Sequence, residues 1–141
     1  MIYFLKYKVL PAPDPEDVEN TKYMTKDEIR EVATKPSKVW VDAGSGTLGY
    51  IFVEVIGCDE LKNKDKKIGK KSDPFVCMTF EDTAVVTDVI DQTLCPRWMP
   101  WSRRAFAFRC SHPHSILSLG MFRAFTRKDC FSLIYYHFGN I

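Results

Sequence analysis

Residues 69–76 read Gly69-Lys70-Lys71-Ser72-Asp73-Pro74-Phe75-Val76, and this stretch decides how the rest of the chain is interpreted. An alternating apolar run precedes it at residues 50–56, and another apolar run follows it up to residue 80. Because proline has a fixed φ and no backbone N–H, Pro74 marks a junction between a loop and a strand. An acidic side chain held at such a junction can bind a metal ion, whereas the adjacent lysines would bind an anionic surface. The sequence therefore predicts a loop between two strands, with metal binding and anion binding as its two candidate functions.

The composition is that of an ordinary soluble globular protein. The chain has 141 residues, of which 45% are hydrophobic and 27% charged, and this length supports one domain with a short extension. The formal net charge is only +2, so an electrostatic function must come from a local patch rather than from the whole surface.

The cysteines and the apolar segments predict a cytoplasmic protein. The cysteines are odd in number and form no CxxC pair, which favours a reducing setting; they are Cys58, Cys77, Cys95, Cys110 and Cys130. The first ten residues lack the charged start and the cleavage site of a secretory signal. No stretch approaches the ~20 apolar residues that a membrane span requires. We therefore expect a protein that is soluble or peripheral on a membrane.

The chain divides into an extension over residues 1–38 and a β domain over residues 39–141. Thr25 and Glu28 match a capping box, which opens a short helix near residues 26–33 in an otherwise irregular extension. From residue 39 onward, short runs rich in Val, Ile, Phe and Tyr alternate with turn residues, which predicts an all-β, antiparallel sandwich of about seven to eight strands. These runs cover residues 39–42, 50–57, 75–80, 84–90, 104–109, 116–122 and 130–136.

Motifs that suggest catalysis or cofactor binding do not fit this pattern. Residues 44–49 match GxGxxG, but a strand follows where a dinucleotide site needs a helix, so we expect a tight connection between two strands. Residues 110–114 read Cys-Ser-His-Pro-His, which is not the spacing of a zinc site. No serine has the G-x-S-x-G setting of a nucleophile. We therefore predict that the protein is not an enzyme.

A run of lysines is the strongest chemical signal. Each lysine near an anionic membrane contributes ~1 kcal/mol of attraction, so such a run would adsorb weakly and in a salt-sensitive way. The run lacks interleaved aromatic residues for stacking on bases, so no nucleic acid is expected as a partner. An ordinary solvated loop is the alternative explanation. The lysines are Lys62, Lys64, Lys66, Lys67, Lys70 and Lys71, interrupted by the acidic Asp65.

These residues together resemble a C2 domain, the Ca²⁺- and phospholipid-binding β-sandwich. The resemblance runs from Gly49 to Phe122 and extends less closely to Tyr136. Its motifs are the strand at residues 50–61, the turn Ser72-Asp73-Pro74-Phe75-Val76, Thr87-Asp88-Val89-Ile90, Leu94-Cys95-Pro96-Arg97-Trp98, and Leu117-Ser118-Leu119-Gly120-Met121-Phe122. The resemblance implies a C2-type sandwich whose loops at one end carry the function.

C2 domains bind Ca²⁺ through aspartates from two loops, and this chain keeps only part of that pattern. By resemblance, Asp65 and Asp73 occupy first-loop ligand positions and Asp129 is a late ligand. The second loop of the family carries Asp-x-Asp, whereas this chain reads Arg123-Ala124-Phe125. Ca²⁺ requires ~6–8 oxygen ligands, and an arginine at a ligand position would repel it, so we predict weak or lost Ca²⁺ dependence. Ca²⁺ is therefore a doubtful cofactor.

The departure at Arg123 suggests a specific replacement for the metal. The Arg123 guanidinium would pair with the Asp73 carboxylate and neutralise the loop permanently. Arg123 pointing into water is the alternative. With the basic residues around it, Phe125 would insert shallowly into lipid headgroups, so Arg123 and Phe125 join the lysines as lipid-binding candidates.

The function that this sequence predicts is peripheral attachment to anionic phospholipids through the lysine-rich loop. One alternative is a protein-interaction module that uses an exposed sheet edge. Another is a Ca²⁺-dependent phospholipid-binding domain detached from a larger lipid-related protein. The last run, residues 130–136, would form an exposed edge strand. Residues 39–41 would complete the sheet, or the chain is a fragment with an incomplete C-terminus, or its tail departs from an ancestral domain.

Overall fold

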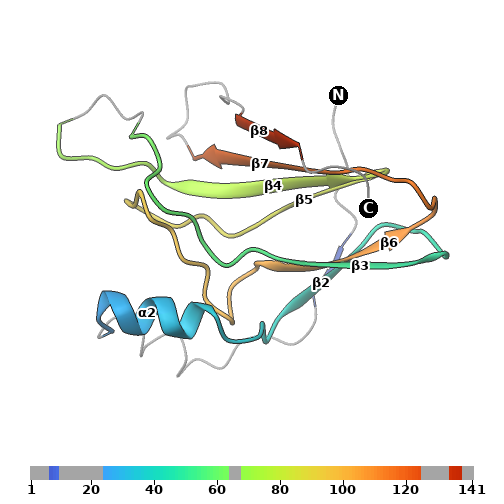
Figure 1. The fold of residues 1–141 in the computed structure, drawn as a ribbon, viewed down its shortest axis with the longest axis horizontal. Coiled ribbons are helices and arrows are strands. Elements are labelled where there is room, and N and C mark those ends of the chain that lie inside the picture. Colours follow the sequence, from blue (N-terminus) through green and yellow to red (C-terminus); the bar gives the residue numbers. More distant parts are fainter. Residues whose placement is uncertain (1–6, 10–23, 64–67, 125–133, 138–141) are drawn as a thin grey trace.

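Two four-stranded sheets pack face to face in the computed structural model, which describes residues 7–9, 24–63, 68–124 and 134–137 (Figure 1). The predicted β-sandwich is therefore confirmed. The first sheet has the order β1 (Tyr7–Val9), β2 (Trp40–Ala43), β6 (Ala105–Cys110), β3 (Gly49–Glu54). The second has the order β5 (Thr83–Val86), β4 (Pro74–Phe80), β7 (Leu117–Arg123), β8 (Ile134–His137).

Every described strand pair is antiparallel except β2 with β6, which is parallel. The expectation of antiparallel pairing throughout is corrected at this pair. The reason lies in the glycine-containing segment between β2 and β3, which crosses the end of β6 instead of closing a hairpin. A Cβ at Gly46 would lie 2.2 Å from the backbone carbon of Cys110 in β6, so only glycine fits there.

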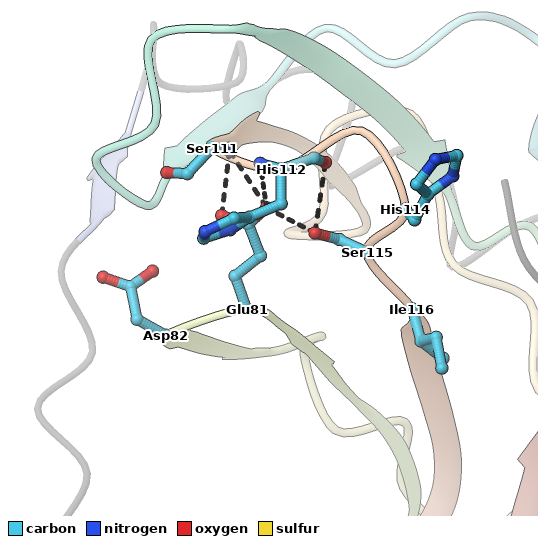
Figure 2. Close-up of a pocket in the computed structure, with 7 residues that line it drawn as sticks. All are labelled: Glu81, Asp82, Ser111, His112, His114, Ser115 and Ile116. Carbon is cyan, nitrogen blue, oxygen red and sulfur yellow. Dashed lines mark hydrogen bonds and ion pairs between the residues drawn. The ribbon is translucent and has the colours of Figure 1, made fainter.

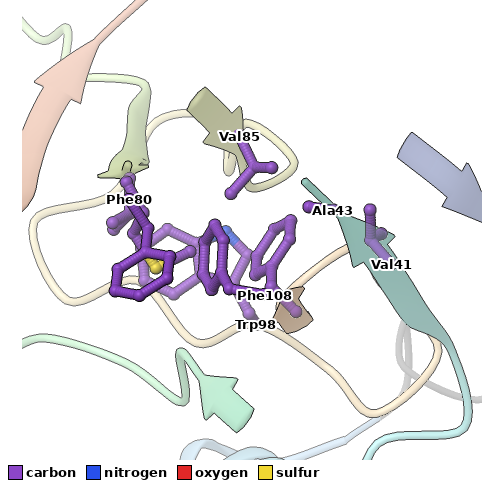
Figure 3. Packing of buried hydrophobic residues seen from close by; sticks show 9 residues of the cluster. Val41, Ala43, Phe80, Val85, Trp98 and Phe108 are labelled. Atoms are coloured by element: carbon purple, nitrogen blue, oxygen red, sulfur yellow. The ribbon is translucent and has the colours of Figure 1, made fainter. Parts of the chain in front are cut away.

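The core lies between the two sheets and is mainly aromatic and aliphatic (Figure 3). Burial alternates along β4, as it does in a strand with one face on the core. Phe80 and Phe108 come from opposite sheets, and their rings pack 5.7 Å apart between centroids. Trp98 lies in the same cluster, fully buried, and its indole N–H donates to the Asp88 carbonyl at 2.7 Å. Each large apolar side chain buried in this way contributes ~1.5–3 kcal/mol.

The helix α2 (Lys26–Ala33) begins and ends as the capping box predicts. The Thr25 hydroxyl accepts from the Glu28 backbone N–H at 3.3 Å, and the Glu28 carboxylate accepts from the Thr25 backbone N–H at 2.6 Å. The second hydrogen bond and that from the Thr25 hydroxyl lower the pKa of Glu28. This reciprocal pair satisfies donors that the first turn of a helix leaves unpaired.

A fully buried arginine, Arg104, joins the helical segment to the sandwich. Its guanidinium and Nε donate to three backbone carbonyls, one hydroxyl and one carboxylate, which belong to Ala33, Lys35, Trp98, Ser37 and Glu54. Burial raises the pKa of Glu54, but hydrogen bonds from Ser37 and Arg104 and the charge of Arg104 outweigh it, so the pKa lies below its usual value. The segment before residue 39 thus contacts the sandwich directly, while the boundary predicted at residue 38 stays a prediction.

The strands differ from the predicted runs mainly at their ends. β3 ends at Glu54 rather than at residue 57, and Gly57 instead forms an isolated bridge with Arg97. β5 ends at Val86 rather than at residue 90, since the Asp88 N–H donates to Arg103 and the Ile90 N–H to Pro74. β1 was not predicted, because a three-residue strand with lysine at its centre shows no recognisable alternation.

Candidate functional site

Three segments meet at one end of the sandwich, where β3, β5 and β7 end and β4 begins (Figure 1). Backbone hydrogen bonds connect these segments to one another. The Leu61 N–H donates to Leu94, and the Thr93 N–H donates to Ser72, both at 2.9 Å. The Ala124 N–H, just after β7, donates to the Asp73 carbonyl at 2.7 Å. The predicted first and second loops therefore lie side by side.

Asp73 serves as a bracket between two of these segments. Its Oδ1 accepts from the backbone N–H of Gln92 at 2.7 Å and from the Gln92 side-chain amide at 3.2 Å. The same amide group accepts, through Oε1, from the Lys71 N–H at 3.2 Å. Gln92 itself has a φ of 52°, in the left-handed region that non-glycine residues rarely adopt. Asp73 and Gln92 together fix the end of the lysine-rich loop to the neighbouring segment, which we name the Asp73–Gln92 bracket.

The described part of the lysine-rich loop presents exposed basic side chains around one exposed apolar residue. Lys62, Lys70 and Lys71 are exposed, and Ile68 is fully exposed. Asn63 braces the loop from inside, because its side-chain amide donates to the Lys70 carbonyl at 2.8 Å. Lys64, Asp65, Lys66 and Lys67 lie outside the described residues.

The second-loop candidates are described only in part. Arg123 is the last residue of β7 and lies opposite Pro74 in the β4–β7 register. The structure gives the Asp73 carboxylate to Gln92, which is a partner other than the Arg123 guanidinium that the sequence suggested. Phe125 and Asp129 lie outside the described residues. Phe122, the neighbour of Arg123, stacks on Phe75 with 5.5 Å between ring centroids.

The described residues supply too few ligands for a metal ion. Among them, no group of three or more His, Cys, Asp or Glu side chains is placed to hold one. Asp73 is the single described member of the predicted Ca²⁺ ligands, and its Oδ1 already accepts two hydrogen bonds. Ca²⁺ requires ~6–8 oxygens, so Asp73 alone does not fit it. Since Asp65 and Asp129 are outside the described residues, weak or lost Ca²⁺ dependence stays a prediction.

Three residues of this end were missed from the sequence: Asn63, Ile68 and Gln92. Ile68 had a recognisable signal, since it is an isolated apolar residue inside a run of lysines. Asn63 and Gln92 act through amide hydrogen bonds across 7 to 21 residues of chain, and no local pattern marks such contacts.

The opposite end of the sandwich holds an open pocket of about 700 Å³, shown in Figure 2. Its main polar contact is Glu81, in the turn between β4 and β5, which reaches the segment between β6 and β7. The Glu81 carboxylate accepts from the Ser115 hydroxyl at 2.6 Å and from the backbone N–H groups of Ser111 and His112 at 2.9 and 3.0 Å. Its Oε1 also lies 3.6 Å from His112 Nδ1. Glu81 therefore holds this end of the fold closed.

Replacing Glu81 with glutamine should make thermal stability less dependent on pH. The hydrogen bonds, first that from Ser115, lower the pKa of Glu81 from 4.5 to about 2, against the effect of desolvation. A carboxyl group with a lowered pKa stabilises the fold fully above 4.5 and loses that contribution as the pH falls towards 2. The gap in Tm between wild type and Glu81→Gln should therefore be widest at neutral pH and narrow on acidification.

Thermal unfolding scans from neutral pH down to about 2 measure this gap. Asp82→Asn is the matched control, because it removes the neighbouring charge and leaves the hydrogen bonds of Glu81 in place. A gap that stays constant over the whole range would show that the Glu81 charge does not matter.

A comparison with protein-family models matches residues 49–132 to the C2 domain. The chain belongs to the C2 domain family. The match begins at the first residue of β3 and includes the lysine-rich loop, the Asp73–Gln92 bracket and β7. The resemblance found in the sequence is therefore confirmed. A search among curated proteins found no match.

Solved structures of C2-containing proteins share this fold at low sequence identity. A C2 domain of plant Extended Synaptotagmin 1 has a TM-score of 0.52 and 20% identity, over 63% of this chain and 66% of that one. The tandem C2 domains of Extended-Synaptotagmin 2, calcium bound, give 0.51 and 22%, over 63% of this chain and 34% of that one. Human GIVD cytosolic phospholipase A2 in complex with methyl gamma-linolenyl fluorophosphonate gives 0.51 and 19%, over 67% of this chain and 14% of that one. The chain thus spans less than two thirds of each, and the likeness shows the fold.

No helix in the described part of the chain has the length and apolar character needed to cross a bilayer.

Proposed function

We propose that this C2 domain is a cytoplasmic, peripheral membrane-binding module that attaches to anionic phospholipids through its lysine-rich loop, with weak or lost Ca²⁺ dependence. Membership of the C2 family supports lipid binding in general. The proposal about the loop is supported by one observation above all. Ile68 is fully exposed at the turn of a loop whose described lysines are exposed as well.

This arrangement suits the boundary between lipid headgroups and acyl chains. Lysines near an anionic surface contribute ~1 kcal/mol each, and a buried Ile side chain contributes ~1.5–3 kcal/mol. Gly69 follows Ile68 with a φ of 81°, so the chain turns sharply there and leaves Ile68 at the tip. The Asp73–Gln92 bracket keeps the C-terminal arm of the loop in place without a metal ion. Charge would bring the loop to the membrane, and Ile68 would anchor it.

Cosedimentation with phospholipid vesicles tests the proposed function. Binding should require phosphatidylserine, persist when Ca²⁺ is chelated, and weaken as salt screens the lysines. Equal binding to neutral and anionic vesicles would overturn the lysine-based attachment. Binding that appears only after Ca²⁺ is added would instead favour the Ca²⁺-dependent alternative, with Asp65 and Asp129 completing the site.

Replacing Ile68 with serine should weaken vesicle binding about tenfold, because a shallowly buried Ile loses ~1–2 kcal/mol of apolar transfer energy. The salt dependence of binding should stay the same, since the lysines are unchanged. Ile116→Ser is the matched control, because Ile116 is also exposed but lines the pocket at the opposite end. Unchanged affinity in Ile68→Ser would show that attachment is purely electrostatic.

We also propose that the chain has no catalytic activity. In the pocket beside His112 and His114, the Ser115 hydroxyl donates to the Glu81 carboxylate and the His112 carbonyl, so it is not presented to a histidine as a nucleophile would be.

A further inference from the structure

β3 lies at the edge of its sheet and carries a row of exposed apolar side chains. Leu48, just before the strand, is 61% exposed, Tyr50 is 49% exposed and Phe52 is 67% exposed. The Tyr50 and Phe52 rings stack at 5.9 Å, and Trp40 of β2 meets Phe52 edge-on at 5.6 Å. Membrane attachment through the lysine-rich loop does not use this face.

The hydrogen-bonding groups of β3 divide between its two sides. The Val55 N–H donates to the Arg104 carbonyl, so in the register that pairs Glu54 with Ala105 the odd-numbered residues bond to β6. In an antiparallel pair the intervening residues direct their N–H and C=O groups to the other side. Tyr50, Phe52 and Glu54 therefore direct theirs towards the open edge. Among the described strands, β6 is the partner that β3 has in this sheet.

This edge lacks the features that normally prevent strands from pairing between molecules. Natural edge strands carry lysines, prolines or bulges, whereas β3 reads Gly-Tyr-Ile-Phe-Val-Glu. Its one charged residue, Glu54, already accepts from Arg104 at 2.7 Å. A Cβ at Gly49 would meet no atom within 4 Å, so the start of the strand is open as well.

We propose that β3 is a self-association edge, and that two copies of this chain pair their β3 strands antiparallel about a two-fold axis at Ile51. This register overlaps residues 48–54 of both copies along their whole length. It places Tyr50 opposite Phe52 of the second copy, an aromatic cross-strand pair that occurs twice by symmetry. It also places Glu54 opposite Leu48, so the two carboxylates do not face each other. The edge is complementary to itself, and for this reason a second copy is the occupant.

The pairing is weak and depends on concentration. A fully enclosed aromatic side chain buries ~150–250 Å², and the two aromatic residues of each copy are only half to two thirds exposed. Two copies together therefore bury less than the ~1,200 Å² at which stable interfaces begin. The protein is mainly monomeric when dilute and dimerises as its concentration rises.

Sedimentation velocity and amide hydrogen exchange, both without lipid, test the proposal independently of membrane attachment. The mean mass should rise towards that of a dimer between low micromolar and near-millimolar concentration. Over the same range, the N–H groups of Tyr50, Phe52 and Glu54 should become protected from exchange. Those of Ile51 and Val53 should be protected at every concentration, because they bond to β6.

Phe52→Lys should weaken dimerisation about tenfold or more, since it removes both aromatic pairs and adds the charge that natural edges use. Ile116→Lys is the control at an exposed apolar residue elsewhere, and it should leave dimerisation unchanged. A monomer at the highest concentration would overturn the proposal. So would a dimer in which the exchange of Tyr50 and Phe52 does not change, or one that Phe52→Lys leaves intact.

Discussion

Replacing Arg104 with methionine should lower the free energy of unfolding by about 3–5 kcal/mol, the cost of breaking a buried ion pair by removing one partner. Arg104 is fully buried and donates to five acceptors. Methionine fills a similar volume but leaves the carbonyls of Ala33 and Trp98 without their donor in the interior. It also leaves Glu54 without its cation. Unsatisfied buried acceptors cost ~1–3 kcal/mol each, so the loss is large even if water reaches some of them.

Urea unfolding followed by tryptophan fluorescence measures this loss as a shift in midpoint. Arg103→Met is the matched control, because it makes the same chemical change one residue away. The Arg103 side chain is 34% exposed and pairs with Asp88 near the surface, an interaction worth ~0–1 kcal/mol. Equal stability losses in the two variants would contradict the role assigned to Arg104. Arg104→Lys should be intermediate, since an ammonium cannot donate to five acceptors in one plane.

Replacing Lys62, Lys70 and Lys71 together with glutamine should weaken binding to phosphatidylserine vesicles on the order of 100-fold at low salt. Each lysine near an anionic surface contributes ~1 kcal/mol, and about 1.4 kcal/mol corresponds to a tenfold change in affinity. All three side chains are exposed on the described part of the loop. The backbone carbonyl of Lys70 and the N–H of Lys71 hold the loop through Asn63 and Gln92, and these contacts survive the substitutions.

Cosedimentation at several salt concentrations measures both the affinity and the number of charges involved. The triple variant should show a flatter salt dependence than the wild type, and the two affinities should converge at high salt. The control is Lys26, Lys35 and Lys38 changed to glutamine, which removes the same net charge from exposed positions around α2. If the control loses as much affinity, the whole surface attracts the membrane and the loop has no special role.

Local patterns predicted those parts of the fold that depend on neighbours in sequence. The capping box of Thr25 and Glu28 and the helix after it are as expected, and so are the positions of the strands. The parallel pairing of β2 with β6 was beyond reach, because alternation tells which face of a strand is buried but not which strand lies beside it. Arg104 was missed for a similar reason. An arginine at the start of a strand normally reaches solvent, and only the carbonyls of a distant helix end make its burial favourable.

The candidate site was predictable in composition but not in wiring. The lysines are a run in sequence, so their exposure on one loop followed from the sequence alone. The partner of Asp73 did not, because Gln92 lies 19 residues away in a turn that no pattern distinguishes. The residues that carry the remaining predictions, among them Lys66, Phe125 and Asp129, lie outside the described part of the chain.

The Asp73–Gln92 bracket has a consequence for what the domain can sense. A carboxamide neither gains nor loses a proton in the physiological range, and it does not dissociate as a bound ion does. The arm of the loop that it holds is thus supported permanently and does not wait for an ion to arrive. Attachment through such a loop would follow the lipid composition of the membrane, and it would be insensitive to brief rises of calcium in the cell.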